Sequence, residues 1–156
     1  MLGKGVERVS ALFFYYNTRM ADYSAIRFED GTVEVSTGLN SSRLTGSAAL
    51  IQEVLIELLS DNIPARARGA GLASLIKYSD PTREGVVATE IANAVSTAQT
   101  HIFANQRDAR GLTSTERLRS LTLTSLDFDG IEWKLGLTIE SLDGTISTIT
   151  QGLVSG

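Results

Sequence analysis

The residues of this 156-residue sequence that are best suited to chemistry are a single histidine and a few closely spaced carboxylates. His101 stands beside the apolar pair Ile102 and Phe103. A catalytic base needs an oriented partner and a metal ion needs several ligands, whereas the chain has one His and no Cys. We therefore expect His101 to be structural, and we predict no catalytic residue, no cofactor site and no metal site.

Paired carboxylates would suit glycoside hydrolysis, because most glycosidases use two. Glu53 and Glu57 fall in one predicted helix, and Asp127 and Asp129 fall near a predicted turn. We expect these four side chains on solvated faces or in turns, where nothing raises the pKa of a carboxylic acid. The sequence therefore favours a protein that is not an enzyme.

Two glycine-containing motifs resemble ligand-binding loops only in part. Gly69–Ser74 lacks the third glycine and the βαβ context of a dinucleotide fingerprint. Asp127–Gly130 begins like a calcium loop but lacks its third acidic position and its distal glutamate. We interpret the second motif as a hairpin turn.

Composition excludes further classes of function. A net charge of -4 and a pI of about 5.0 argue against a nucleic-acid partner, which usually needs a basic face. The apolar cluster Val9–Tyr16 falls short of the roughly 20 residues of a membrane-spanning helix, so we expect no membrane partner. The length fits one domain, residues 1–156, with an arm and hairpin over 1–40 and a core over 44–150.

The pattern of apolar residues predicts two helices. Residues 48–59 place apolar side chains on one broad face and Gln52, Glu53 and Glu57 on the other, with Ser47 as the expected N-cap. Residues 84–106 carry a second apolar stripe at helical spacing.

The rest of the pattern predicts β-structure. Alternation around Asp30-Gly31 indicates a β-hairpin over residues 23–36. Residues 116–150 read as a three-strand meander with a bulge near Ser125, where the apolar phase switches from one face to the other. Its last strand is expected at Thr145–Thr150, followed by a flexible tail, Gln151–Gly156. The predicted class is α+β: an antiparallel sheet with two main helices packed on one face, plus an N-terminal β-hairpin.

From residue 44 onward the order of these segments resembles the small baseplate wedge, or sheath-initiator, family of contractile-tail phages and related injection systems. Its elements here are Leu44-Thr45-Gly46, the helix Ala49–Leu59, a loop with Pro64, the run Arg68–Leu75, the helix Glu84–Gln106 and the strands Leu118–Ile149. The chain departs from the family in two places. It has Glu116-Arg117 where members often have glutamate-proline-arginine, and its first 40 residues exceed the usual lead-in.

The resemblance implies a structural subunit of the tail baseplate, present in six copies around the tail tube. Its partners would be wedge subunits, the sheath protein and the tube or hub, in the virion and, during assembly, in the host cytoplasm. Wedge contacts would use Val54, Leu55 and Leu58. Sheath docking by strand addition would use the uncharged last strand at Thr145, Ile146, Thr148 and Ile149.

Two other classes remain open at this point. One is a small tail-associated cell-wall hydrolase, and the other is a different tail component, such as a tail terminator or a sheath-like fragment.

Overall fold

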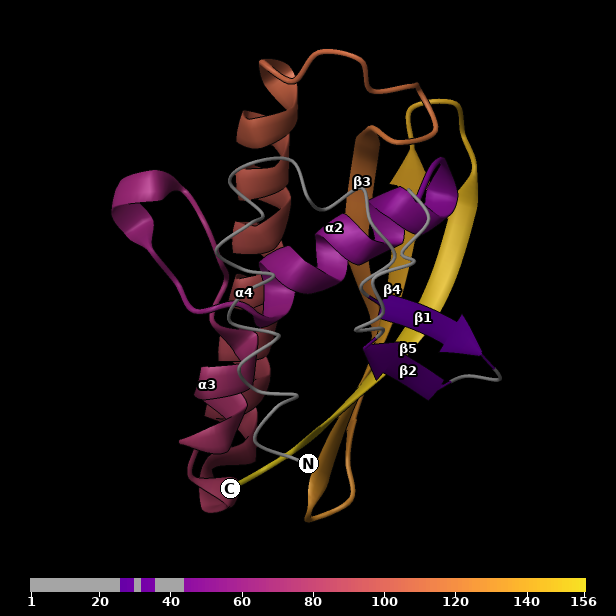
Figure 1. Ribbon diagram of the computed structural model, residues 1–156. Helices are drawn as coiled ribbons and strands as arrows, with labels where there is room; N and C mark the ends of the chain where they lie inside the picture. Colours follow the sequence, from indigo (N-terminus) through magenta and orange to yellow (C-terminus); the bar gives the residue numbers. More distant parts are fainter. Residues whose placement is uncertain (1–25, 30–31, 36–43) are drawn as a thin grey trace.

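A computed structural model describes residues 26–29, 32–35 and 44–156 of the chain (Figure 1). The helices are α2 (Ser47–Leu59), α3 (Leu72–Lys77) and α4 (Glu84–Arg107), with 3-10 turns at Pro64–Arg66 and Pro81–Arg83. The strands are β1 (Ile26–Glu29), β2 (Thr32–Val35), β3 (Leu118–Phe128), β4 (Glu132–Ser141) and β5 (Ile146–Val154). This is the predicted α+β class, with helices covering one face of an antiparallel sheet.

The predicted hairpin is present as an antiparallel pair of short strands. β1 pairs with β2 in a register that sets Ile26 against Val35 and Phe28 against Val33. The proposed turn at Asp30-Gly31 and the arm before residue 26 lie outside the described residues.

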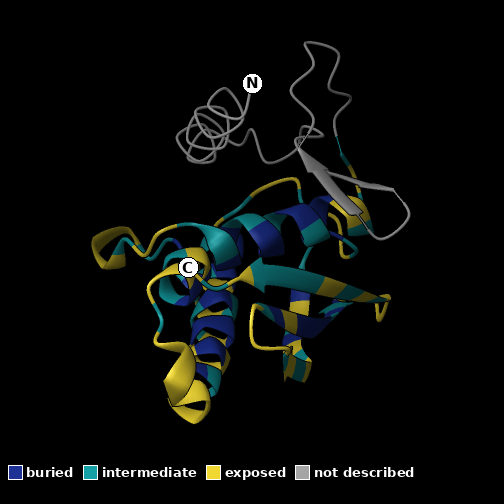
Figure 2. Ribbon diagram, turned by 90° about the horizontal axis from the view of Figure 1, so that it is seen from below, coloured by how far each residue is buried: buried dark blue, intermediate teal, exposed yellow. Residues whose placement is uncertain are grey.

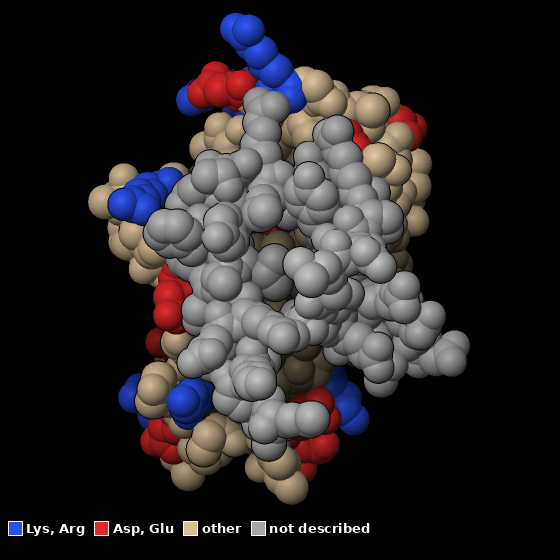
Figure 3. Space-filling model, in the orientation of Figure 1, with Lys and Arg blue, Asp and Glu red and all other residues tan. Residues whose placement is uncertain are grey.

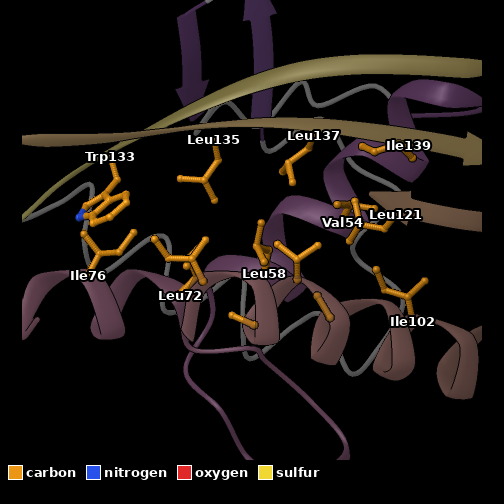
Figure 4. Close-up of a cluster of buried hydrophobic side chains, with 14 of the residues drawn as sticks. Val54, Leu58, Leu72, Ile76, Ile102, Leu121, Trp133, Leu135, Leu137 and Ile139 are labelled. Carbon is orange, nitrogen blue, oxygen red and sulfur yellow. The ribbon is translucent and has the colours of Figure 1, made fainter. Parts of the chain in front are cut away.

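The main sheet has the order β3-β4-β5, so β4 is its central strand. Alternate side chains of β4 point toward the helices and form a buried row: Trp133, Leu135, Leu137 and Ile139. Figure 4 shows this row facing side chains of the helical layer, among them Leu58, Leu72 and Ile102. Burial of this row against the helices contributes to the stability of the domain, because it removes apolar surface from water.

A bulge in β3 keeps its apolar residues on the same face. The ladder shifts register between Leu123 and Ser125, as the sequence predicts. Beyond the shift, Leu126 and Phe128 pair with Leu135 and Trp133 and pack against the core. The expectation that Leu126 and Phe128 lie on the face opposite Leu121 and Leu123 is therefore wrong. The extra residue in the bulge shifts the alternation of side chains by one position, so all four lie on the same face.

The two long helices match their predicted ranges within one residue, but two details of α2 differ. Its N-cap is Gly46, which makes no side-chain cap, so the expected role of Ser47 is wrong. Gln52 and Glu57 are each only 1% exposed, so the polar side of α2 is not a solvated face. Figure 2 shows buried residues along α2, which packs against α4, α3 and β4.

The last strand is longer than predicted. β5 runs to Val154 because β4 offers it partners along its whole length, ending with Glu132 opposite Val154. Ser155 continues the ladder, since its N–H donates to the carbonyl of Ile131 at 2.9 Å. The expectation of a movable tail over Gln151–Gly156 is corrected: most of that segment is strand.

Candidate functional site

The outer edge of β5 is the candidate functional site. The N–H of Ser141 donates to Thr145 O at 3.0 Å, and that of Ser155 donates to Ile131 O at 2.9 Å. Hydrogen-bonded pairs alternate with non-bonded pairs in an antiparallel ladder, so odd-numbered residues of β5 bond to β4. The even-numbered residues direct their N–H and C=O groups away from the sheet, and we call them the outward set. They are Ile146, Thr148, Thr150, Gly152 and Val154. Within the described part of the chain, no strand pairs with this edge.

α4 covers the first part of the opposite edge of the sheet, at the start of β3. Gln99 accepts a hydrogen bond from the N–H of Leu121 at 2.7 Å, and Gln106 accepts one from that of Leu118 at 2.7 Å. Figure 1 shows α4 lying alongside β3, with β5 on the other side of the sheet. The helix therefore satisfies outward donors of β3, while β5 receives no such cover from it.

β5 itself carries none of the charges that usually protect an edge strand, although its partners on β4 include Glu132, Lys134 and Glu140. From Gly144 to Gly156 the chain has no Asp, Glu, Lys or Arg. Charged side chains, proline and bulges are the common means by which edge strands avoid pairing with other chains. Elsewhere, basic and acidic residues are interspersed in the coloured part of the face shown in Figure 3.

The structure divides the four residues expected to dock a sheath strand. Ile146 and Thr148 are exposed and belong to the outward set. Thr145 lies in the turn before β5, where its N–H donates to Asp143 at 3.0 Å. Ile149 pairs with Leu137 and packs against the core, so its backbone groups point into the sheet.

Sequence reasoning missed the outward residues Thr150, Gly152 and Val154. The alternation of β5 carries the signal, but it becomes readable only when the strand is extended to Val154. The carbonyl of Gly152 accepts a hydrogen bond from the side chain of Gln151 at 2.9 Å. This hydrogen bond occupies one of the carbonyl groups that point away from β4.

Val54, Leu55 and Leu58, the expected wedge contacts, are buried. They are 0%, 1% and 0% exposed, and Val54 and Leu58 belong to the main hydrophobic core. Any contact through these side chains would require the domain to open. We therefore include none of them in the candidate site.

The second notable feature is a buried carboxylate that anchors the loop between α2 and α3. Glu57 Oε1 accepts a hydrogen bond from the N–H of Gly69 at 2.7 Å and lies 3.0 Å from His101 Nδ1. The main-chain carbonyl of Glu57 also accepts from the N–H of Ala70 at 2.8 Å. His101 thus has an oriented partner, which its sequence context did not reveal, and the expectation of a solvated Glu57 is wrong.

The electrostatics of Glu57 follow from this position. Desolvation by burial raises the pKa of its carboxyl group above the usual value of 4.5. The hydrogen bonds from Gly69 and His101, together with the positive charge of Arg68, oppose that rise. Glu57 is therefore a buried carboxyl group whose hydrogen bonds hold the loop between α2 and α3 in place.

The raised pKa predicts a pH dependence of stability. A raised folded-state pKa stabilises the fold fully below the unfolded value of about 4.5, and this contribution is lost as pH rises through the folded value. Relative to Glu57→Gln, the wild-type free energy of unfolding should therefore fall as pH rises above 4.5. Urea titrations between about pH 4 and pH 8 measure the difference. Glu90→Gln, an exposed change on α4, should follow the wild type, and parallel profiles for Glu57→Gln would contradict the assignment.

A polar network joins the start of β3 to both long helices. Gln106 Nε2 donates to Glu53 Oε2 at 2.7 Å and to Glu116 O at 3.1 Å. Glu116 accepts from the N–H of Gly46 at 3.1 Å, and Arg117 donates to the carbonyl of Gln106 at 2.8 Å. Glu116-Arg117, which stands where the resembling family has its glutamate-proline-arginine cluster, thus contributes to the internal structure of this chain.

The chain matches no family model, no curated protein and no solved structure. In the part of the chain that the structure describes, no helix is long and apolar enough to cross a membrane. The same residues contain no cluster of His, Cys, Asp or Glu side chains that could hold a metal ion.

Proposed function

We propose that this chain is a structural subunit of a contractile-tail baseplate, which joins wedge proteins around the tail tube and starts sheath assembly by accepting a strand at the β5 edge. The observation that carries the proposal is the difference between the two edges of the sheet. α4 supplies hydrogen-bond partners to β3, whereas β5 is uncharged and has outward backbone groups. Strand addition needs an edge of the second kind.

An incoming strand would gain apolar contacts as well as hydrogen bonds. Ile149 and Leu153 lie at the margin of the core and are only partly buried. A sheath segment with apolar residues on the side facing the helices would cover both. Main-chain bonds would supply affinity, and these apolar neighbours would supply specificity for the incoming sequence.

A proline at an outward position tests this mechanism. Thr148→Pro removes an N–H that points away from β4, so the fold should survive while the incoming strand loses a donor in the middle of its ladder. We expect tails built with this variant to form baseplates but to lack sheath, as counted by negative-stain electron microscopy.

The adjacent residue provides the matched control. Ser147→Pro removes an inward N–H and should weaken the pairing of β5 with β4, which lowers the melting temperature. Full-length sheaths on tails that carry Thr148→Pro would refute strand addition at this edge.

The Glu57–His101 pair is the observation that bears on the alternative of a cell-wall hydrolase. A carboxyl group with a raised pKa beside a histidine is a common feature of active sites. Here Glu57 is 1% exposed and bound to the loop of its own chain, which favours a structural role. Clearing of a peptidoglycan suspension by the wild type but not by Glu57→Gln would favour the enzyme instead.

A further inference from the structure

The sequence of β5 is self-complementary about Thr150. Ile146 and Val154 stand four residues before and after it, and they are 65% and 64% exposed. Thr148 and Gly152 are likewise placed at equal distances from Thr150. All of these residues belong to the outward set. Residues at equal distances from Thr150 therefore direct their backbone groups to the same edge and their side chains to the same face of the sheet.

We propose that a second copy of this chain docks on the β5 edge, antiparallel and with its two-fold axis at Thr150. This inference rests on the edge that the proposed function assigns to the sheath, and it describes the subunit before assembly. In that register, each outward residue of one copy forms a hydrogen-bonded pair with an outward residue of the other. Ile146 of each copy then lies beside Val154 of its partner, so both exposed aliphatic side chains gain an apolar neighbour.

The charge of the paired segments and the area that they bury indicate how strongly two copies would associate. Each copy carries a net charge of -4, but the paired segments, from Gly144 to Gly156, contain no charge, so no like charges meet within the strand pair. One pair of nine-residue strands buries much less than the roughly 1,200–2,000 Å² of a standard interface. The bond from Gln151 to the carbonyl of Gly152 must also be exchanged. The dimer is therefore weak and reversible, and a sheath strand can displace it.

Charge substitution at the symmetry axis tests the register. Thr150→Lys places two ammonium groups opposite each other across the axis, whereas Thr148→Lys separates them by about 13 Å along the strands. By analytical ultracentrifugation of the full chain, we expect Thr150→Lys to weaken dimerisation at least about tenfold and Thr148→Lys to change it little. Mixing Thr150→Lys with Thr150→Glu should restore association.

A cysteine variant provides an independent measurement. The chain has no native Cys, and residues in a hydrogen-bonded antiparallel pair have Cα atoms about 5.5 Å apart, within disulfide range. Under mild oxidation Thr150→Cys should form a covalent dimer, while Thr148→Cys should not. A monomeric wild type at high concentration, equal crosslinking of both variants or no rescue in the charge-swapped mixture would each overturn the proposal.

The sheath assay separates this inference from the proposed function. Sheathless tails with Thr148→Pro, together with a monomeric wild type, would leave the proposed function standing and refute only the dimer. A charge-sensitive dimer with full sheaths on Thr148→Pro tails would refute only the function.

Discussion

Gly69→Ala should destabilise the chain by about 3 kcal/mol or more, the largest loss that we expect from a single methyl group. Gly69 has a φ of 70°, a region that L side chains rarely adopt. A Cβ built there would overlap the backbone carbonyl of Asp61, and backbone cannot move aside cheaply. Relief of that overlap would also break the hydrogen bond from Gly69 to Glu57, leaving a buried acceptor short of a donor.

Gly111→Ala is the matched control for that change. Gly111 has a similar φ of 80°, but nothing lies within 4 Å of the position that a Cβ would occupy. It should therefore show only the conformational penalty, roughly 1–2 kcal/mol. Urea unfolding of both variants measures the difference, and equal losses would mean that the contact with Asp61 contributes nothing.

Gln106→Leu should lower the free energy of unfolding by about 2–4 kcal/mol. Gln106 is 4% exposed and uses both ends of its amide: it accepts from the N–H of Leu118 and donates to Glu53 and to the carbonyl of Glu116. Leucine has nearly the same size but makes none of these bonds. The loss should therefore come from polar groups left without this partner, with little change in packing.

Gln99→Leu is the comparison for this second change. Gln99 is half-buried and caps the N–H of Leu121 at the same edge, so its replacement should cost only about 1 kcal/mol. Hydrogen exchange followed by NMR should show faster exchange of the Leu118 amide in Gln106→Leu and of the Leu121 amide in Gln99→Leu. Unchanged exchange at both amides would show that α4 does not cover the start of the β3 edge.

Much of the fold could be predicted because its elements carry local signals. The apolar stripe of α4, the alternation along β4 and the turns at Asp129-Gly130 and Asp143-Gly144 all depend on residues close in sequence. The bulge near Ser125 was also predicted, but the face of Leu126 and Phe128 was not. Assigning that face requires the cross-strand partners, which local alternation does not give.

The candidate site was predicted only in part, for a related reason. The absence of charge in β5 indicated an edge, but the division into inward and outward residues depends on hydrogen bonds such as that from Ser141 to Thr145. Glu57 was missed because its partners, Gly69 and His101, are distant in sequence, and a glutamate on a helix normally faces water. In both cases the assignment depends on hydrogen bonds that the sequence alone does not reveal.

Amide hydrogen exchange along β5 tests the central claim most directly. In dilute free chain, the inward amides of Ser147 and Ile149 should exchange slowly and the outward amides of Thr148 and Thr150 quickly. In sheathed tails, all four should be protected, because an added strand accepts hydrogen bonds from the outward pair. If Thr148 and Thr150 exchange as quickly in sheathed tails as in the free chain, no strand is added at β5 and the account fails.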